Sequence, residues 1–381
     1  MHTVVHISAD FPDGLGSQKT RAIRNLIEAA PGFRHVVYSL NRVNGFGHIS
    51  SVPFGEDRIA VAYGAPPKGI MLATCLDRVR AWISDDLASR GVVPDIVHAH
   101  KLSVEGLIGL GLAENTGAKL LVSIQGDSDT KITRARPDLR GRWRAVVRRA
   151  DGLVSMSLWP LPQLAAILRE DAARTRILPA MTKAEHLSPS TATGAPRLAS
   201  VFHLSPWRRK GADTIARAAR IAAETYQGLQ IDIYGDGAGV ELVEVKAMLR
   251  RLDPDGRVRL MGPVEHAAVQ PTLSSYAGFL MPSRRETYGL AYVEALFAGV
   301  PVVYSRGRGI DGLLPESLIG YGCDPHSAAD VAAGIVHVIR NEATLKAGIA
   351  QAQADHVLDP LRGEAIGRAY TEILRGLAPT G

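Results

Sequence analysis

Short apolar runs alternate with helical patterns along the whole 381-residue chain. The apolar runs predict buried strands, and apolar residues at three- and four-residue spacings predict helices between them. This alternation is typical of parallel α/β sheets. In the first half the predicted strands are 3–8, 36–40, 96–99, 120–124, 152–156 and 176–178, and the predicted helices include 18–29, 73–88, 104–114 and 141–149.

A polar passage rich in serine, threonine and proline, residues 183–196, interrupts the alternation and predicts an interdomain linker. We therefore expect an N-terminal domain of residues 1–182 and a C-terminal domain of residues 197–362. Two successive doubly wound sheets imply a cleft, with ligands at the carboxyl ends of the strands. The second half has predicted strands at 199–204, 230–234, 258–260, 278–281 and 301–304, and helical patterns at 213–224, 240–252, 328–340, 343–356 and 363–377.

The composition is that of an ordinary globular protein, with 46% apolar and 22% charged residues. Cys75 and Cys323 are the only cysteines, so neither a disulfide framework nor a cysteine metal site is indicated. The first residues lack the pattern of a signal peptide, and no apolar run approaches 18 residues. We expect a cytosolic enzyme.

The net charge of +6 lies in the first half of the chain, where residues 1–180 hold 23 Lys and Arg against 17 Asp and Glu. The stretch Lys131–Arg149 alone has eight basic residues against Asp138. It could meet an anionic membrane at its inner face or a phosphate-bearing acceptor, and the alternative is a solvated helix face. No aromatic pattern accompanies it, so we expect no nucleic-acid partner.

Glu286 and Glu294 stand eight residues apart where an apolar run ends and a helical pattern begins near Tyr288. A helix start presents unpaired N–H groups and the positive end of its dipole, which suits a phosphate. Gly289 allows backbone to approach closely there, and Leu290 begins the apolar face of the helix. Two carboxylates that bracket an anion site are candidates to bind sugar or ribose hydroxyls, whereas the alternative is two solvated acids.

A basic cluster, Arg208-Arg209-Lys210, follows the strand 199–204 and opens a helix. Cations at the carboxyl end of a strand are well placed to hold a diphosphate, although such clusters are often simply solvated. Gly235 and Gly237 form a glycine turn after the strand 230–234, a pattern that suits any nucleotide-binding fold.

Residues 282–303 resemble the E-x7-E signature of the retaining GT-B glycosyltransferases of family 4, PS-x-x-E-x-F/Y-G-L-x-x-x-E-A-x-x-x-G-x-P-V. The resemblance covers essentially the whole chain and is densest over residues 199–312. It implies GT-B architecture, which is two Rossmann-like doubly wound parallel-sheet domains facing a cleft. It also implies that the C-terminal helix, about 363–381, packs back on the N-terminal domain.

The resemblance implies a donor site in the C-terminal domain. Glu286 would orient donor-sugar hydroxyls, and Lys210 would hold the diphosphate together with Arg209, for which Arg208 is the alternative. Glu294 would bind the ribose of the nucleotide. No bound metal ion is implied. The implied donor-binding residues are Gly16, Gly235, Gly237, Gly262, Tyr288, Gly289, Leu290 and Glu294.

The acceptor side is implied by looser matches in the N-terminal domain. A glycine-rich loop after the first strand contains Gly14 and Gly16, and His100 ends a segment similar to the family's D-V-V-H-x-H. Gln125 stands where the family has a histidine near the reacting sugar, and glutamine can hydrogen-bond a hydroxyl but cannot take a proton. His98 and His100 lack a third metal ligand in the sequence pattern, so no metal site is predicted there.

The predicted activity is retaining transfer of a sugar from a nucleotide-diphosphate donor to a hydroxyl of a glycan, lipid-linked or small-molecule acceptor. A GT-B sugar-nucleotide epimerase and a catalytically silent partner subunit remain the alternatives. Gln125 and the altered segment Leu178–Thr182 favour the silent subunit, whereas Glu286, Glu294 and Lys210 argue against it.

Overall fold

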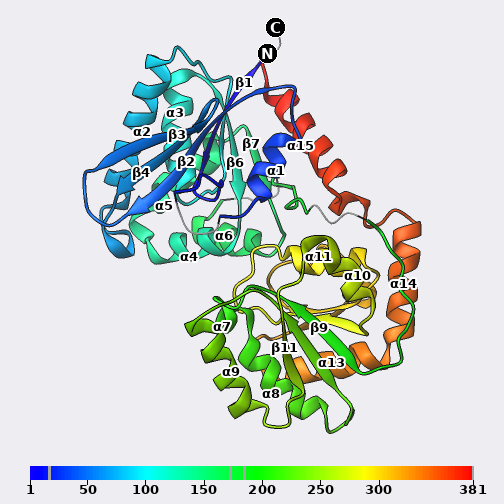
Figure 1. The fold of residues 1–381 in the computed structure, drawn as a ribbon. Coiled ribbons are helices and arrows are strands. Elements are labelled where there is room, and N and C mark those ends of the chain that lie inside the picture. Colours follow the sequence, from blue (N-terminus) through cyan, green and yellow to red (C-terminus); the bar gives the residue numbers. More distant parts are fainter. Residues whose placement is uncertain (16–18, 171–173, 183–185, 380–381) are drawn as a thin grey trace. The chain divides into compact units, whose positions relative to one another are not determined.

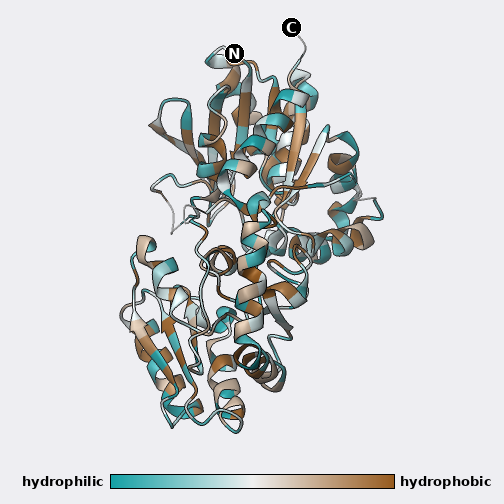
Figure 2. Ribbon diagram, turned by 90° about the vertical axis from the view of Figure 1, so that its right-hand side faces the viewer, coloured by the Kyte–Doolittle hydropathy of each residue, from teal (hydrophilic) through white to brown (hydrophobic). Residues whose placement is uncertain are grey.

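The computed structural model describes residues 1–15, 19–170, 174–182 and 186–379, and it divides into two compact units (Figure 1). Unit 1 is Met1–Met181 together with Glu364–Gly381, and unit 2 is Thr182–Gly363. Strands of both units carry hydrophobic residues along much of their length (Figure 2). No helix in the described ranges combines the length and apolar character that crossing a membrane would need.

Unit 1 is built on an eight-stranded sheet in the order β3-β4-β2-β1-β5-β6-β7-β8. Neighbouring strands are parallel except for the antiparallel edge pair β3 and β4. The strands are β1 (Thr3–Ser8), β2 (Arg34–Val43), β3 (Ile49–Gly55), β4 (Arg58–Gly64), β5 (Ile96–Ala99), β6 (Lys119–Ile124), β7 (Gly152–Ser155) and β8 (Arg176–Ile177).

Helices cover both faces of this sheet, because side chains alternate along each strand. Val5 and Ile7 of β1 belong to the core cluster under α2, α3 and α5, whereas Val4 belongs to a second cluster with Tyr370 and Leu374 of α15. The helices are α1 (Ala22–Glu28), α2 (Leu72–Ser89), α3 (Glu105–Thr116), α4 (Asp127–Ala135), α5 (Arg140–Arg149), α6 (Pro160–Leu168) and α15 (Gly363–Leu377).

Unit 2 has a six-stranded, fully parallel sheet in the order β11-β10-β9-β12-β13-β14. Counted from its first strand, this is the 3-2-1-4-5-6 order of a dinucleotide-binding fold, and the order reverses between β9 and β12. The strands are β9 (Arg197–Val201), β10 (Gln230–Tyr234), β11 (Val258–Gly262), β12 (Gly278–Leu280), β13 (Val302–Ser305) and β14 (Gly320–Cys323).

Helices connect the parallel strands of unit 2, and α13 packs against α8 and β14. The prediction of two Rossmann-like parallel sheets is confirmed. The helices are α7 (Trp207–Lys210), α8 (Ala212–Ala222), α9 (Val240–Leu252), α10 (Val269–Ser274), α11 (Leu290–Phe297), α12 (Glu316–Ile319), α13 (Ala328–Arg340) and α14 (Glu342–Ala354).

The segment expected to be a linker makes contacts within unit 2. Ser188 N donates to Phe297 O at 2.8 Å, and Thr193 N donates to the Glu342 carboxylate at 2.7 Å. Residues 183–185 lie outside the described residues. The polar composition of this passage is therefore matched by hydrogen bonds to the surface of unit 2.

The last helix, α15, is part of unit 1 and lies beside α1 (Figure 1). Tyr370 is fully buried, and its hydroxyl is 2.9 Å from Nδ1 of His98 on β5. A Cβ added to Gly367 would stand 2.9 Å from Cβ of Ala29, so a small residue is needed where this helix meets the end of α1.

Candidate active site

The sequence-predicted donor residues of unit 2 lie at the carboxyl edge of its sheet. Lys210 is in the segment after β9, Gly235 and Gly237 follow β10, and Glu286 follows β12. Strands β9 and β12 are parallel neighbours, and the strands that follow each of them in the chain are added on opposite sides of this pair. The loops after β9 and β12 therefore flank the switch point at which such sheets bind ligands.

Lys210 and Glu286 meet at this switch point. Lys210 Nζ is 2.6 Å from Glu286 Oε2, and the two side chains are 17% and 12% exposed. The backbone brings them together, because Arg284 N donates to Arg209 O at 2.8 Å. Gly211 has φ +80°, and a Cβ there would lie 2.3 Å from Pro282 O, so this close approach requires glycine.

The two neighbouring arginines differ in their surroundings. Arg208 is 3.0 Å from Glu244, and its guanidinium lies 4.0 Å from the centroid of the Trp207 ring. Arg209 is exposed, and within the described residues its side chain makes no ion pair. Arg209 is therefore the cation of this segment that an added anion could recruit without breaking an existing pair.

Helix α11 starts two residues later than its pattern predicts, because Gly289 is its N-cap residue, with φ +84°. A Cβ at Gly289 would stand 2.4 Å from Cδ2 of Tyr292. Leu290 is the first helical residue. Tyr288, predicted as donor-binding, is buried, and burial raises the pKa of its phenol above the usual range.

Glu294 lies inside α11 and is only 7% exposed. Its Oε1 accepts a hydrogen bond of 2.7 Å from Thr182 Oγ1, and burial raises the pKa of its carboxyl group. Sequence reasoning did not single out Thr182, because its contact with Glu294 joins residues 112 positions apart and no local sequence pattern predicts it.

The predicted glycine positions are places of close backbone approach. A Cβ at Gly235 would stand 1.9 Å from Phe202 O, and one at Gly237 would stand 2.6 Å from Cβ of Leu204. Gly262 ends β11 with φ +81° and accepts a hydrogen bond from Gly235 N at 2.8 Å. These glycines hold the ends of β9, β10 and β11 close together.

At the carboxyl edge of unit 1, Gly14 is exposed with φ +77°, and the predicted Gly16 lies outside the described residues. Asp13 anchors this loop. Burial alone would raise the pKa of Asp13, but hydrogen bonds from Asn41, Lys19 and Ser39 outweigh it and lower the pKa to about 2.

Gln125 follows β6 and is 7% exposed, with a side-chain Nε2 that has no hydrogen-bond partner in the described part of the chain. The buried Asp129 carboxylate holds its backbone, accepting from Gln125 N at 2.9 Å and from Ser103 N at 2.8 Å. Asp129 thereby joins the loops after β5 and β6.

A buried acid that sequence reasoning missed lies at the same edge. Glu105 is fully buried, accepts a hydrogen bond of 2.9 Å from Ala9 N, and has its pKa raised to about 7 by burial. The neighbouring Lys101 is paired with Asp10 at 2.6 Å.

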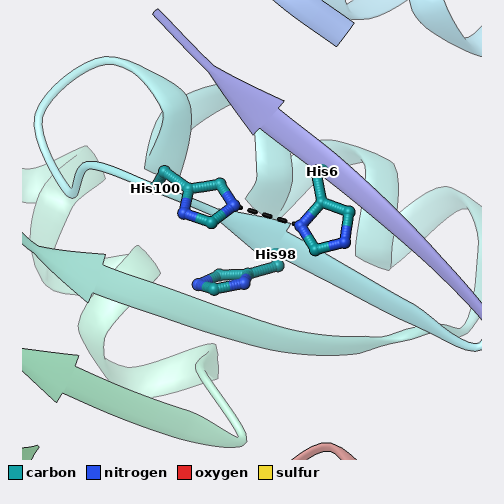
Figure 3. Close-up of side chains that lie close together, drawn as sticks. All are labelled: His6, His98 and His100. Carbon is teal, nitrogen blue, oxygen red and sulfur yellow. Dashed lines mark hydrogen bonds between the residues drawn. The ribbon is translucent and has the colours of Figure 1, made fainter. Parts of the chain in front are cut away.

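His100 is fully buried and belongs to a chain of imidazoles that includes His6 on β1 (Figure 3). His6 Nδ1 is 3.1 Å from His100 Nε2, and His6 Nε2 is 2.9 Å from His35 Nδ1. His35 Nε2 lies 2.7 Å from Ala30 O. Burial lowers the pKa of His6, His98 and His100, that of His100 to about 3, so these rings are neutral at pH 7.

The carbonyl of Ala30, at one end of this hydrogen-bonded series, fixes the tautomers of His35, His6 and His100. Ala30 O can only accept, so His35 carries its proton on Nε2 and accepts at Nδ1. His6 then donates from Nε2, and His100 donates from Nε2 to His6. The Nδ1 lone pair of His100 is left without a partner among the described residues.

His6 supplies the third nearby histidine that the sequence pattern did not reveal, since β1 and β5 are distant in the chain but adjacent in the sheet. Ligand atoms of His6, His98 and His100 lie within 4.8 Å of one another, close enough for a metal ion. Both nitrogens of His98 are engaged, by Tyr370 and Ser123, as are both of His6. We therefore interpret the cluster as a hydrogen-bonded network.

The basic stretch Lys131–Arg149 is largely engaged in local contacts. Arg142 pairs with Asp77 and Arg149 pairs with Asp151. Arg144 donates to Leu168 O at 2.7 Å, and Arg148 pairs with Glu170 at 2.7 Å. Much of this stretch is therefore not a free cationic surface.

Comparison with known proteins agrees with this geometry. A family model, glycosyl transferases group 1, matches residues 195–341, which is less than half of the chain but contains the Lys210, Glu286 and Glu294 positions. The D-inositol 3-phosphate glycosyltransferase of Pseudarthrobacter chlorophenolicus is 26% identical over 253 residues, 62% of this chain and 60% of that protein. Over these residues the chain is therefore similar to glycosyltransferases.

Solved structures extend the likeness to the whole fold. Sucrose-phosphate synthase from Thermosynechococcus elongatus has a TM-score of 0.72 at 18% identity and covers 99% of both chains. HepE from Anabaena, in complex with UDP and glucose, has a TM-score of 0.64 at 16% identity, covering 99% of this chain and 100% of that chain. The chain spans only 44%, 24% and 60% of the lengths of three curated relatives it matches.

Proposed function

We propose that the protein is a cytosolic retaining glycosyltransferase, which moves a sugar from a nucleotide-diphosphate donor to a hydroxyl of a glycan, lipid-linked or small-molecule acceptor. The observation that carries this proposal is the Lys210–Glu286 pair at the switch point of a 3-2-1-4-5-6 sheet, beside the start of α11. The cation and the helix start can bind a diphosphate, and the carboxylate can accept hydrogen bonds from sugar hydroxyls.

In this proposal the donor diphosphate lies against Lys210, the free Arg209 and the start of α11. Lys210 turns from Glu286 toward the phosphate when the donor binds, and Glu286 then accepts hydrogen bonds from hydroxyls of the donor sugar. The solved structure of HepE with UDP and glucose supports a nucleotide and a sugar as ligands of this fold. The charges come from side chains, so the proposal requires no metal ion, and EDTA should leave transfer unchanged.

The proposed reaction exchanges one C–O bond for another on the same face of the sugar. The bond between the anomeric carbon and the β-phosphate oxygen breaks, and a bond from the anomeric carbon to the acceptor oxygen forms. The acceptor hydroxyl proton passes to the leaving phosphate oxygen, so no protein base is needed, consistent with Gln125 in place of histidine. Lys210 and Arg209 stabilise the charge that grows on the diphosphate.

On the acceptor side, His100 Nδ1 is an acceptor without a partner and Gln125 Nε2 is a donor without one, within the described ranges. They follow the adjacent strands β5 and β6. A hydroxyl can both donate to His100 Nδ1 and accept from Gln125 Nε2. We propose that these two residues and the Gly14 loop line the acceptor side.

The first test of the proposal is a panel of nucleotide sugars and nucleoside diphosphates. A matching donor should raise the melting temperature, because a ligand that binds only the folded state stabilises it by about 2.7 kcal/mol at a hundred times its Kd. Incubation with that donor and candidate acceptors should yield a glycoside with retained anomeric configuration. Conversion of the donor alone would instead indicate the epimerase, and binding without turnover would indicate the silent subunit.

Replacing Glu294 by alanine is expected to weaken nucleotide binding by about ten- to a hundredfold, the value of a hydrogen bond to a charged group. Isothermal titration calorimetry with the nucleoside diphosphate identified by the panel measures this directly. Thr182→Val, which removes the hydroxyl that contacts Glu294, serves as the control for a purely structural effect. Unchanged affinity in Glu294→Ala would remove this residue from the ribose site.

A further inference from the structure

Two loops of unit 1 expose large apolar side chains at the carboxyl edge of its sheet. Residues 42–48 follow the buried part of β2, and residues 65–71 follow β4. We call these two loops the apolar–basic surface. The exposed fractions of its apolar residues are 39% for Val43, 49% for Phe46, 58% for Ile70 and 47% for Met71.

Hydrogen bonds join the two loops into one surface. Gly64 N donates to His48 O at 2.7 Å, and Ala65 N donates to Val43 O at 3.1 Å. Arg42 Nη1 donates to Pro66 O at 3.1 Å. The exposed apolar side chains therefore belong to a fixed patch, and larger exposed apolar patches mark sites of interaction.

The second loop has an unusual backbone. Lys68 and Met71 both have left-handed conformations, with φ of +59° and +54°. Non-glycine residues adopt this region at a cost, and such conformations cluster at functional sites. The two residues flank Ile70, the most exposed apolar side chain of the surface.

The same surface is cationic. Arg42, Lys68 and Arg78 are exposed, and none of them pairs with a carboxylate in the described part of the chain. Arg78 donates to Gly47 O at 2.9 Å, and its guanidinium lies 5.6 Å from the centroid of the Phe46 ring. Neither residues 41–49 nor residues 65–76 contain an aspartate or a glutamate.

We propose that the apolar–basic surface docks on an anionic lipid bilayer. Apolar side chains that enter the headgroup region and cations that meet anionic headgroups are the two signals that together give stable interfacial binding. The charge complementarity favours phosphate headgroups over an apolar protein face, because three cations would otherwise be buried without partners. Four of the seven arginines of Lys131–Arg149, by contrast, pair with carboxylates.

Docking through this surface would bring lipid to the sheet edge that holds His100 and Gln125, because β2, β4, β5 and β6 run in the same direction. A hydroxyl of a lipid-linked acceptor would then be presented at the acceptor side. This second step rests on the proposed function, whereas the docking itself does not.

The test is co-sedimentation of the full chain with vesicles of phosphatidylglycerol and phosphatidylcholine, compared with phosphatidylcholine alone. The wild type should sediment with the anionic vesicles, and the bound fraction should fall as salt is added. Ile70→Ser should lower the partition coefficient by about tenfold, and Lys68→Gln should lower it by about fivefold.

Matched variants distinguish vesicle binding through this surface from nonspecific binding. Val93→Ser alters a side chain that is 74% exposed but precedes β5 at the opposite edge of the sheet, and Arg220→Gln removes an exposed cation of unit 2. Both should bind vesicles like the wild type. Nucleoside diphosphate binding should be equal in all variants, which confirms folding and keeps a failure of docking distinct from a failure of the donor site.

Three outcomes would overturn the proposal. The wild type could stay in the supernatant with anionic vesicles at low salt. Ile70→Ser and Lys68→Gln could bind as tightly as the wild type. Finally, Lys131→Gln could abolish binding that Lys68→Gln leaves intact, which would assign the contact to the basic stretch instead.

Discussion

Lys210→Ala is expected to lower the turnover number for sugar transfer by about a hundred- to a thousandfold, the usual cost of removing one group that stabilises developing charge. Negative charge grows on the diphosphate as the glycosidic bond breaks, so the cation is worth more in the transition state than in the ground state. Steady-state kinetics with a retained glycoside product measure this, and nucleotide affinity should fall much less.

The neighbouring arginines provide the matched controls. Arg209→Ala should also lower turnover, because its free guanidinium is available to the diphosphate. Arg208→Ala should leave turnover close to that of the wild type, because Glu244 and the Trp207 ring already hold that side chain. A Lys210→Ala enzyme with intact kcat and only a raised KM would contradict the role given to this lysine.

Acidification from pH 6.5 to 5 is expected to destabilise the protein steeply through the imidazole network of unit 1. His6, His98 and His100 have pKa values lowered by burial, so in this window the unfolded chain binds protons that the folded protein does not. This contribution to the free energy of unfolding is therefore fully present above pH 6.5. Below that pH it is lost as the pH is lowered, by about 1.4 kcal/mol per pH unit for each ring.

The raised pKa of Glu105 acts in the opposite direction. With its pKa near 7, the folded protein keeps a proton that the unfolded chain loses above about pH 4.5, which removes about 1.4 kcal/mol per pH unit from the slope. The three rings outweigh this one acid, so stability still falls as the pH is lowered from 6.5 to 5. Urea unfolding at pH 6.5, 6 and 5 measures this fall, and His326→Asn, an exposed site, should not change it. A flat profile would show that the rings titrate normally.

The sequence predicted the parallel sheets because their buried strands are continuous apolar runs. It did not predict β3, because β3 is an edge strand whose residues are mostly exposed and include Pro53. It also missed β4, although that strand is largely buried. Strand β14, Gly320–Cys323, has two glycines in four residues and so lacks a strand pattern. β3 is placed by its pairing with β4, and β14 by its pairing with β13.

The candidate site likewise contains residues that the sequence predicted and residues that it did not. Lys210, Glu286 and Gly289 were found because each belongs to a local motif with a chemical reason. Thr182 and His6 were missed because their contacts join distant parts of the chain, and no spacing rule connects them to Glu294 or to His100. The difference between Arg208 and Arg209 depends on Glu244, which only the folded chain brings near.

The return of the chain from unit 2 to α15 sets an order of assembly during synthesis. Unit 2 is continuous in sequence, so all of its strands and helices leave the ribosome before α15 does. Unit 1 is discontinuous, and the apolar cluster around Val4, Leu121 and Tyr370 stays open to water until α15 is made. The first unit to begin synthesis is therefore the last to be completed, and the nascent protein depends on unit 2 folding without it.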